Sequence, residues 1–213
     1  MAFDKVGHFV LGQVVKANPD KPGYLTLIGG TDRMAVLPRV CADGPYRVGD
    51  RFYACIKSVE GPYPIVSQRS GHFIRRVAEL LFATLIAEGR VDVKAVGTVQ
   101  HAEFVKIAVG SPTGDDPIKL CLPYLREFGS YSRLRPCLVL YSASPEEFIK
   151  QALLPAPLGE VKGITVDRRA HEAEVRVPAA VMPRFLGKAG LNVAVAGRVT
   201  GYSIRLASLQ EGI

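Results

Sequence analysis

The chain lacks the features that mark membrane-spanning, secreted and metal-binding proteins. No apolar run reaches the roughly 18–20 residues that a membrane span requires, and the first five residues do not begin a secretory signal. The four cysteines, at positions 41, 55, 121 and 137, form no CxxC pair. We therefore expect a cytoplasmic protein with no membrane contact, no disulfide framework and no metal site.

Catalytic motifs are missing as well. The chain contains no GxSxG, Walker, GxGxxG or HExxH pattern. Its histidines, His8, His72, His101 and His171, lack metal-ligand spacing and are interpreted as ordinary surface or turn residues. The sequence therefore predicts a protein that is not an enzyme, with no cofactor and no small-molecule substrate.

Positive charge is present in excess. The net charge is +7 and the isoelectric point is near 9.3, which favours a polyanionic partner. Residues 175–210 contain no acid and five basic residues, which are Arg176, Arg184, Lys188, Arg198 and Arg205. A strip of one charge sign is a candidate track for phosphates. The alternative is a solvated basic surface without a ligand.

Residues 1–70 are predicted to form a small β-barrel. Short strand-like segments, broken by glycine and proline turns, lie at 9–16, 24–28, 34–37, 51–59 and 65–67. Five strands in about 70 residues are typical of an OB-fold.

From residue 71 onward the pattern changes to a duplicated αββααβ plan, with one module predicted at 71–155 and another at 156–213. In the first module a helical apolar stripe runs over 73–88, and strands follow at 91–99, 104–109 and 137–141. Ser144 and Pro145 form a helix start signal. The second module has strands at 163–167, 172–177 and 203–207, with short helices at 179–186 and 191–199.

One motif carries a binding mechanism. Gly187, Lys188, Ala189 and Gly190 form a GxxG tetrad between two predicted helices. Glycines let a nucleic-acid backbone approach closely, and the following helix directs free N–H groups to the same place. In KH modules this turn holds a short single strand of about four nucleotides. Two glycines without any special role are the alternative, because the bare motif is common.

The order of these segments resembles the bacterial transcription factor NusA over nearly the whole chain. S1-like segments lie at 12–15, 34–38, 46–51 and 65–70; KH-like segments lie at 91–96, 106–109, 138–142, 145–149, 164–167, 186–193 and 201–204. The resemblance implies an α+β multidomain protein with an S1-type OB barrel and two type II KH domains. It also implies single-stranded RNA as partner.

Two departures from the family pattern are visible. Residues 122–129 stand where the first KH domain should have its own GxxG, but Leu122, Pro123 and Tyr124 occupy the turn. We therefore expect the first KH domain to be a packing module with weakened RNA contact. The S1-like region also begins near residue 7, without the N-terminal polymerase-binding domain that is typical of the family. This puts the pausing role that depends on that domain in question.

The candidate RNA-binding residues lie in two regions. In the second KH domain they are the GxxG tetrad, Asn192, Arg184, Arg198, Arg176 and Arg205; in the barrel they are Arg33, Arg39 and Arg69. The barrel aromatics Phe9, Tyr24, Phe52, Tyr53 and Tyr63 could stack on bases, but alternation makes half of them core residues, so none is selected individually.

Three functions are compatible with these observations. The first is an RNA-binding factor that modulates transcription elongation, termination or antitermination, with RNA polymerase or another transcription factor as protein partner. The second is a protein–protein adaptor that docks on polymerase or a regulator and barely contacts RNA. The third is an RNA-processing or ribosome-associated module. Salt-dependent binding of single-stranded RNA would separate the first function from the second.

Overall fold

The computed structural model describes residues 5–18 and 22–209. These residues form two compact units. The barrel unit contains the described residues up to Leu81 together with Leu125–Leu134, and the KH unit contains Phe82–Tyr124 and the described residues from Arg135 onward. Within these residues, no helix combines the length and the apolar character needed to cross a bilayer.

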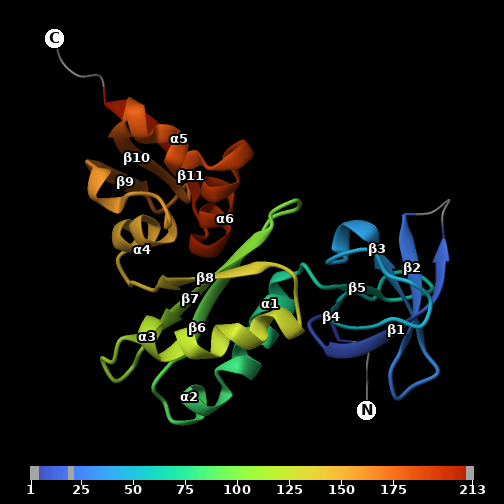
Figure 1. The fold of residues 1–213 in the computed structure, drawn as a ribbon. Coiled ribbons are helices and arrows are strands. Elements are labelled where there is room, and N and C mark those ends of the chain that lie inside the picture. Colours follow the sequence, from blue (N-terminus) through green and yellow to red (C-terminus); the bar gives the residue numbers. More distant parts are fainter. Residues whose placement is uncertain (1–4, 19–21, 210–213) are drawn as a thin grey trace. The chain divides into compact units, whose positions relative to one another are not determined.

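The barrel unit contains the predicted five-stranded barrel (Figure 1). Its strands are β1 (Phe9–Asn18), β2 (Gly23–Ile28), β3 (Met34–Pro38), β4 (Arg51–Ser58) and β5 (Ile65–Ser67), closed in the order β1-β2-β3-β5-β4. Alternation explains the barrel interior: in β2, Tyr24, Thr26 and Ile28 are buried, and the residues between them face outward. The predicted OB barrel is confirmed.

The helical stripe over residues 73–88 is two helices and not one. Helix α1 (Gly71–Leu81) ends before Phe82, and α2 (Ala83–Ala87) begins after it. Phe82 leaves the helical region with φ −97° and ψ 13°, and its side chain is fully buried. The chain therefore passes from the barrel unit to the KH unit at this break.

The KH unit repeats one sheet topology twice. Strands β6 (Asp92–Gly97), β7 (Phe104–Gly110) and β8 (Arg135–Leu140) form one sheet, and β9 (Gly163–Asp167), β10 (Glu172–Pro178) and β11 (Ser203–Leu209) form the other. In each sheet the first two strands pair antiparallel and the last two pair parallel. This repetition confirms the predicted duplication and the fold class, an OB barrel followed by two type II KH domains.

The helices of the two modules differ in length. In the first module, α3 (Pro117–Cys121) continues into the 3-10 helix η2 (Leu122–Ser130). Helix α4 (Pro145–Ala152) follows the first sheet, and the second module has α5 (Met182–Leu186), the 3-10 turn η5 (Lys188–Gly190) and α6 (Leu191–Thr200). Ser144 caps α4 as predicted, because its Oγ accepts a hydrogen bond from the Glu147 N–H at 3.3 Å. The predicted borders at 70/71 and 155/156 stay predictions.

Both sheets of the KH unit share one hydrophobic core. Buried side chains from both modules meet there, namely Ala108, Val139, Phe148, Ile149, Ala152, Leu153, Ala156, Ala173, Val175, Val177, Phe185, Ala196 and Val199. Helix α6 lies against β6 so closely that a Cβ at Gly97 would be 2.6 Å from the Val199 nitrogen. The helix that follows the GxxG tetrad is therefore supported by the sheet of the first module.

Candidate nucleic-acid interface

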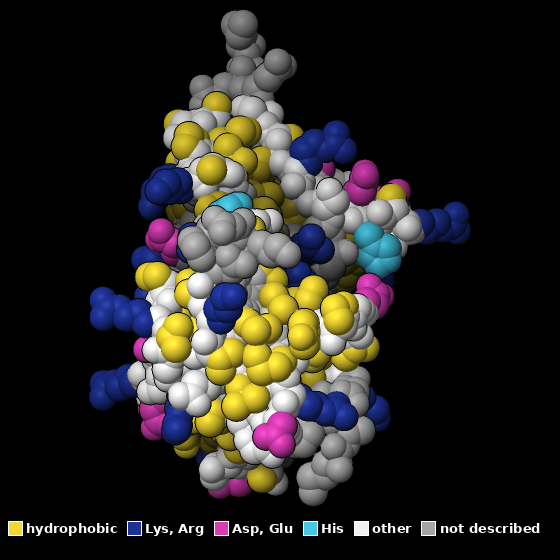
Figure 2. All heavy atoms as spheres, turned by 90° about the vertical axis from the view of Figure 1, so that its right-hand side faces the viewer, with side chains coloured by type: hydrophobic (Ala, Val, Ile, Leu, Met, Phe, Trp, Pro, Cys, Tyr) yellow, Lys and Arg dark blue, Asp and Glu magenta, His cyan; other side chains and the backbone are white. Residues whose placement is uncertain are grey.

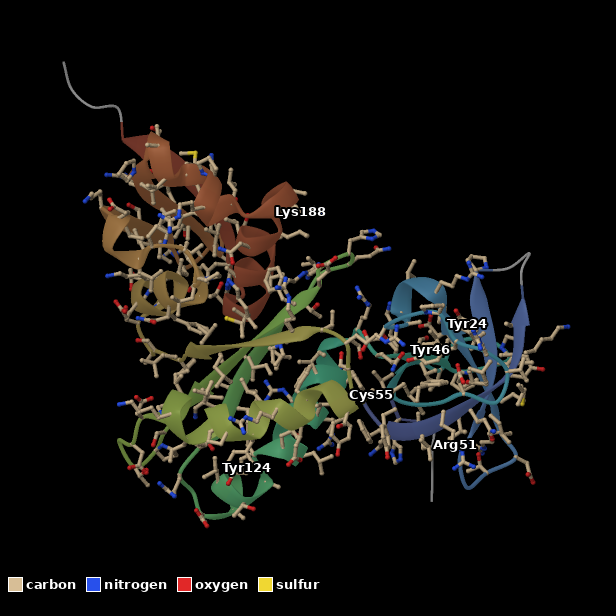
Figure 3. All side chains as sticks on the ribbon, in the orientation of Figure 1. Tyr24, Tyr46, Arg51, Cys55, Tyr124 and Lys188 are labelled. Atoms are coloured by element: carbon tan, nitrogen blue, oxygen red, sulfur yellow. The ribbon has the colours of Figure 1, made fainter. Side chains whose placement is uncertain are left out.

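The GxxG tetrad is a turn with three residues at positive φ. Gly187, Ala189 and Gly190 have φ values of 69°, 52° and 73°. Helix α5 ends at Leu186 and α6 begins at Leu191, so the four residues form the whole connection. Lys188 and Ala189 are exposed at its tip (Figure 3 labels Lys188). The backbone of the turn is thus open to a ligand.

The two glycines are required for different reasons. At Gly187, φ 69° with ψ −178° is a conformation that is essentially restricted to glycine, and a Cβ would lie 2.9 Å from the Asn192 Cβ. At Gly190 nothing lies within 4 Å of an added Cβ, so only the left-handed backbone favours glycine. Ala189 adopts the same region with a side chain, which costs conformational energy.

Asn192 holds the two sides of this turn together. Its Nδ2 donates to the backbone oxygens of Phe185 and Leu153, each at 2.9 Å. Its Oδ1 accepts a hydrogen bond from the Lys106 ammonium at 2.6 Å. With 5% of its surface exposed, the side chain is not available to RNA. We expected Asn192 to contact RNA, but the structure shows it in a supporting position.

Lys106, which no sequence motif indicated, supports Asn192 from the first module. It lies on β7 of the first module, its side chain is fully buried, and its ammonium also donates to the Ala152 backbone oxygen. Burial disfavours the charged form and lowers the pKa of Lys106 to about 8. A lysine within the apolar strand 104–110 is the sequence signal that could have identified it.

A groove lies on the C-terminal side of the turn. A cavity of about 470 Å³ is lined by Val193, Ala194, Gly197 and Arg198 of α6 and by the residues from Gly201 to Ile204. A Cβ at Gly197 would be 2.7 Å from the Tyr202 backbone oxygen, so glycine allows helix and loop to approach closely there. The groove combines an apolar floor with one exposed guanidinium, which suits bases next to a phosphate.

The five basic residues of the strip 175–210 do not form one surface. Arg184, Lys188 and Arg198 are exposed on the helices and the turn between them. Arg176 and Arg205 lie on β10 and β11, opposite the face whose Val175 and Val177 enter the core.

Arg176 and Arg205 also have acidic neighbours. Arg176 is 3.2 Å from Glu174, and Arg205 is 3.8 Å from Glu172. These acids lie just before the strip in sequence, and part of the predicted phosphate track is therefore neutralised.

The three candidate arginines of the barrel do not form one surface either. Arg33 and Arg39 are exposed in different connections of the barrel. Arg69 instead pairs with Asp43, whose side chain is 2% exposed, with 3.5 Å between Nε and Oδ1. A buried carboxylate needs a compensating cation, so Arg69 has a structural task that competes with RNA contact.

The first KH module has no comparable turn. The nine residues of η2 continue directly from α3, Phe128 is buried, and Tyr124 packs edge-on against Phe82 with ring centroids 6.4 Å apart. Side chains thus occupy the place where a GxxG backbone would be exposed.

Comparisons with known proteins match the second KH module and the chain as a whole. A family model described as the NusA-like second KH domain matches residues 145–212, beginning at α4 and thus before the predicted border at 155/156. The chain is 29% identical to the transcription termination/antitermination protein NusA of Thermus thermophilus, covering 94% of this chain and 53% of that protein.

The other NusA relatives give a similar picture. The identity is 26% for the protein of Halalkalibacterium halodurans, over 95% of this chain and 54% of the relative. It is 28% for that of Bacillus subtilis, over 76% and 45%. The chain spans about half the length of the curated relatives it matches.

Proposed function

We propose that the chain, which is similar to NusA proteins over most of its length, binds single-stranded RNA through the GxxG turn of its second KH domain. We further propose that it thereby modulates transcription elongation, termination or antitermination through nascent RNA. The names of the relatives support the process, because they are transcription termination/antitermination proteins. RNA polymerase or another transcription factor is the proposed protein partner.

The observation that carries this proposal is the turn at residues 187–190. Lys188 and Ala189 are exposed at its tip, and Val193, three residues after Gly190, is the first residue of α6 that lines the groove. The ten-residue helix α6 directs its N-terminal N–H groups and positive dipole end toward the same space. A phosphate of a bound strand could contact the turn and the helix N-terminus, while its bases enter the groove.

On this proposal the protein acts by binding and positioning, without turnover. Affinity would come from phosphate contacts with Lys188, Arg184 and Arg198, and preference for single strands from bases that enter the groove. Binding should therefore weaken steeply as salt increases.

A protein–protein adaptor is the second candidate. It is favoured by the loss of the first GxxG turn and by the acidic partners of Arg176 and Arg205. Salt-independent RNA binding, or no binding at low salt, would support this candidate.

The test is the double substitution Lys188→Asp with Ala189→Asp in the full chain. It changes the local charge by three units, and aspartate tolerates the left-handed conformation of position 189 better than alanine does. Arg168→Asp with Ala170→Asp is a matched control, because it makes the same charge change in another exposed turn of the same module.

We expect the Lys188/Ala189 variant to lose RNA affinity by at least about tenfold, with residual binding at low salt through Arg184 and Arg198. The control should stay within about threefold of the wild type. Both variants should keep the stability of the wild type within about 0.5 kcal/mol in a circular dichroism melt. Unchanged RNA affinity of the Lys188/Ala189 variant would show that the GxxG turn does not contact RNA, and it would favour the adaptor function.

A further inference from the structure

An aromatic surface on the barrel unit is not used by the proposed function. On the outer face of neighbouring strands β1 and β4, Tyr53 lies directly opposite Leu11. Arg51 precedes Tyr53 by two residues and faces the same way. Tyr53 is 38% exposed, as is Leu11. Figure 3 shows where Arg51 lies on the barrel.

The Tyr53 ring rests on a support of two further rings. It is stacked on Phe9 with centroids 5.5 Å apart and an interplanar angle of 17°. Phe9 is stacked in turn on Phe73 of α1, at 5.8 Å and 5°. Phe73 is fully buried, so the partly exposed Tyr53 ring is backed by the core of the barrel unit.

A second wall is formed by residues 129–133 of the same unit. The Tyr131 ring lies 5.3 Å from that of Tyr53, at an angle of 45°. Asp43 anchors this segment, because its Oδ2 accepts hydrogen bonds from the Ser132 hydroxyl at 2.6 Å and the Arg133 N–H at 3.0 Å. The ion pair of Asp43 with Arg69 thus stabilises one wall of a cavity of about 410 Å³.

The charges around this cavity favour an anion. Arg51 and Arg133 both line it and are exposed. Gly44 makes room for the guanidinium of Arg133, since a Cβ there would lie 2.3 Å from its Nη1. Among the lining residues Asp43 is the only carboxylate, and it is already paired and hydrogen bonded.

The outer faces of β2 and β3 lack this combination. Leu25 and Leu27 of β2 and Met34 and Val36 of β3 are half-buried aliphatic residues on the outer face. Figure 2, which faces the barrel side of Figure 1, shows hydrophobic side chains gathered with Lys and Arg around them. Aliphatic side chains offer no ring on which a base can stack.

We propose that the cavity at Tyr53 is a nucleotide-binding subsite for single-stranded RNA. One base stacks on Tyr53 beside Tyr131, and the adjoining phosphates contact Arg51 and Arg133. The subsite rests on the proposed RNA-binding function and adds a second contact, distinct from the GxxG turn. Stacking tolerates any base, so this subsite contributes affinity and little sequence preference.

The test separates the subsite from the GxxG turn. An unstructured oligouridylate of about 12 nucleotides, within the site sizes of OB-folds, is titrated against the full chain with and without Lys188→Asp/Ala189→Asp. Tyr53→Ala should lower affinity about tenfold in either background, and Tyr53→Phe, which keeps the ring, should retain affinity within about twofold. Arg51→Gln with Arg133→Gln should reduce the salt dependence, whereas the exposed Arg47→Gln should not.

A spectroscopic readout distinguishes contact from altered folding. The chain contains no tryptophan, so Tyr53→Trp places a single reporter in the cavity. Oligouridylate should quench its emission, and it should leave the emission of Val48→Trp, at a 65% exposed position that does not line the cavity, unchanged.

The outcomes distinguish the two proposals. Unchanged RNA affinity of Tyr53→Ala together with an unquenched Tyr53→Trp would overturn the subsite while leaving the proposed function intact. A protein partner would then be the remaining occupant of this surface. A wild-type chain that binds no oligouridylate at low salt would overturn both proposals.

Discussion

The two KH domains share one strand topology and differ at the connection between their central helices. In the first, α3 passes into η2 without a turn, and Tyr124 and Phe128 direct side chains inward from it. In the second, Gly187 and Gly190 let the backbone leave the helix and present Lys188. A few residue types thus decide whether the same topology exposes backbone to a ligand or fills the space with side chains.

The two domains are nevertheless connected through the second turn. Lys106 of the first domain donates to Asn192, which in turn donates to the backbone oxygen of Phe185 just before the turn and to that of Leu153 at the end of α4. The first domain, which lacks a GxxG turn, therefore contributes to the position of that turn in the second domain. The comparison predicts that substitutions at this connection will matter more for stability than substitutions in the first domain's η2.

The largest effect is expected for Asn192→Ala. The Phe185 and Leu153 oxygens would be buried without donors, and Lys106 would lose one of its acceptors, so we expect a loss of about 2–4 kcal/mol in the free energy of unfolding. Urea denaturation of the full chain measures it. Arg198→Ala, on the exposed side of the same helix, is the control and should change stability within about 0.5 kcal/mol. Equal stability of the two variants would contradict the role given to Asn192.

A glycine series in the turn should show a graded effect. Gly187→Ala should cost about 2–3 kcal/mol, because it combines a glycine-only backbone with a contact of 2.9 Å. Gly190→Ala should cost about 1 kcal/mol from the left-handed backbone alone. Ala189→Gly should stabilise the protein by about 0.5 kcal/mol, the difference between relief of that strain and the greater entropy of the unfolded chain.

The order within this series is the informative result. Thermal melts of the three variants against the wild type would measure it. If Gly187→Ala cost no more than Gly190→Ala, the close contact between Gly187 and Asn192 would not exist in solution.

Lys106 should make stability depend on pH. Its pKa is lowered to about 8 in the folded state and lies near 10.5 when unfolded, so the unfolded chain binds more protons between these values. The contribution of Lys106 to the free energy of unfolding, measured as the difference between the wild type and Lys106→Met, should therefore rise with pH in this window, by about 1 kcal/mol between pH 7 and 9. Lys106→Met should lack this rise, and Lys119→Met, at an exposed lysine, should keep it.

The measurement should end near pH 9. Burial raises the pKa of Cys137, and of Cys55 and Cys121 to about 12, so thiol ionisation in the unfolded chain opposes the effect and grows as the pH approaches 9. This opposing contribution is the same in the wild type and in Lys106→Met, and it cancels in their difference. Parallel pH profiles of the wild type and Lys106→Met up to pH 9 would show that Lys106 is not buried as described.

The smallest effect on RNA binding is expected in the first domain. Tyr124→Ala with Arg126→Ala should change RNA affinity by less than about twofold, because η2 offers no open backbone. Loss of the Tyr124–Phe82 contact should still cost about 1 kcal/mol of stability. A filter-binding titration beside a melt measures both quantities. Loss of RNA binding with an intact fold would mean that the first domain contacts RNA after all.

Much of the fold was predictable because local patterns and tertiary structure agree. Alternation in β2 separates core from surface, Ser144 caps α4, and glycines interrupt the helices at 187 and 190. The break of the long helical stripe at Phe82 was not predictable, because the apolar pattern continues through it. The chain changes units there, and periodicity carries no information about that.

The candidate site was predicted less completely than the fold. Asn192 follows the GxxG, which suggested an RNA contact, yet it shares a helical stripe with the buried Val195, Ala196 and Val199. This helical spacing predicts that Asn192 lies in the core. Arg176 and Arg205 belong to an acid-free window in sequence, while their strands bring Glu174 and Glu172 beside them.

The sequence by itself determined the strands, the helix starts and the four residues of the turn, because these depend on neighbours within a few positions. Only the tertiary structure decided what Lys106, Arg69 and Tyr53 do. Lys106 meets Asn192 across 86 positions, and Asp43 holds Ser132 across 89. Whether a charged or aromatic side chain supports the fold or faces a ligand depends on such distant partners, since burial and pairing set the energy of each group.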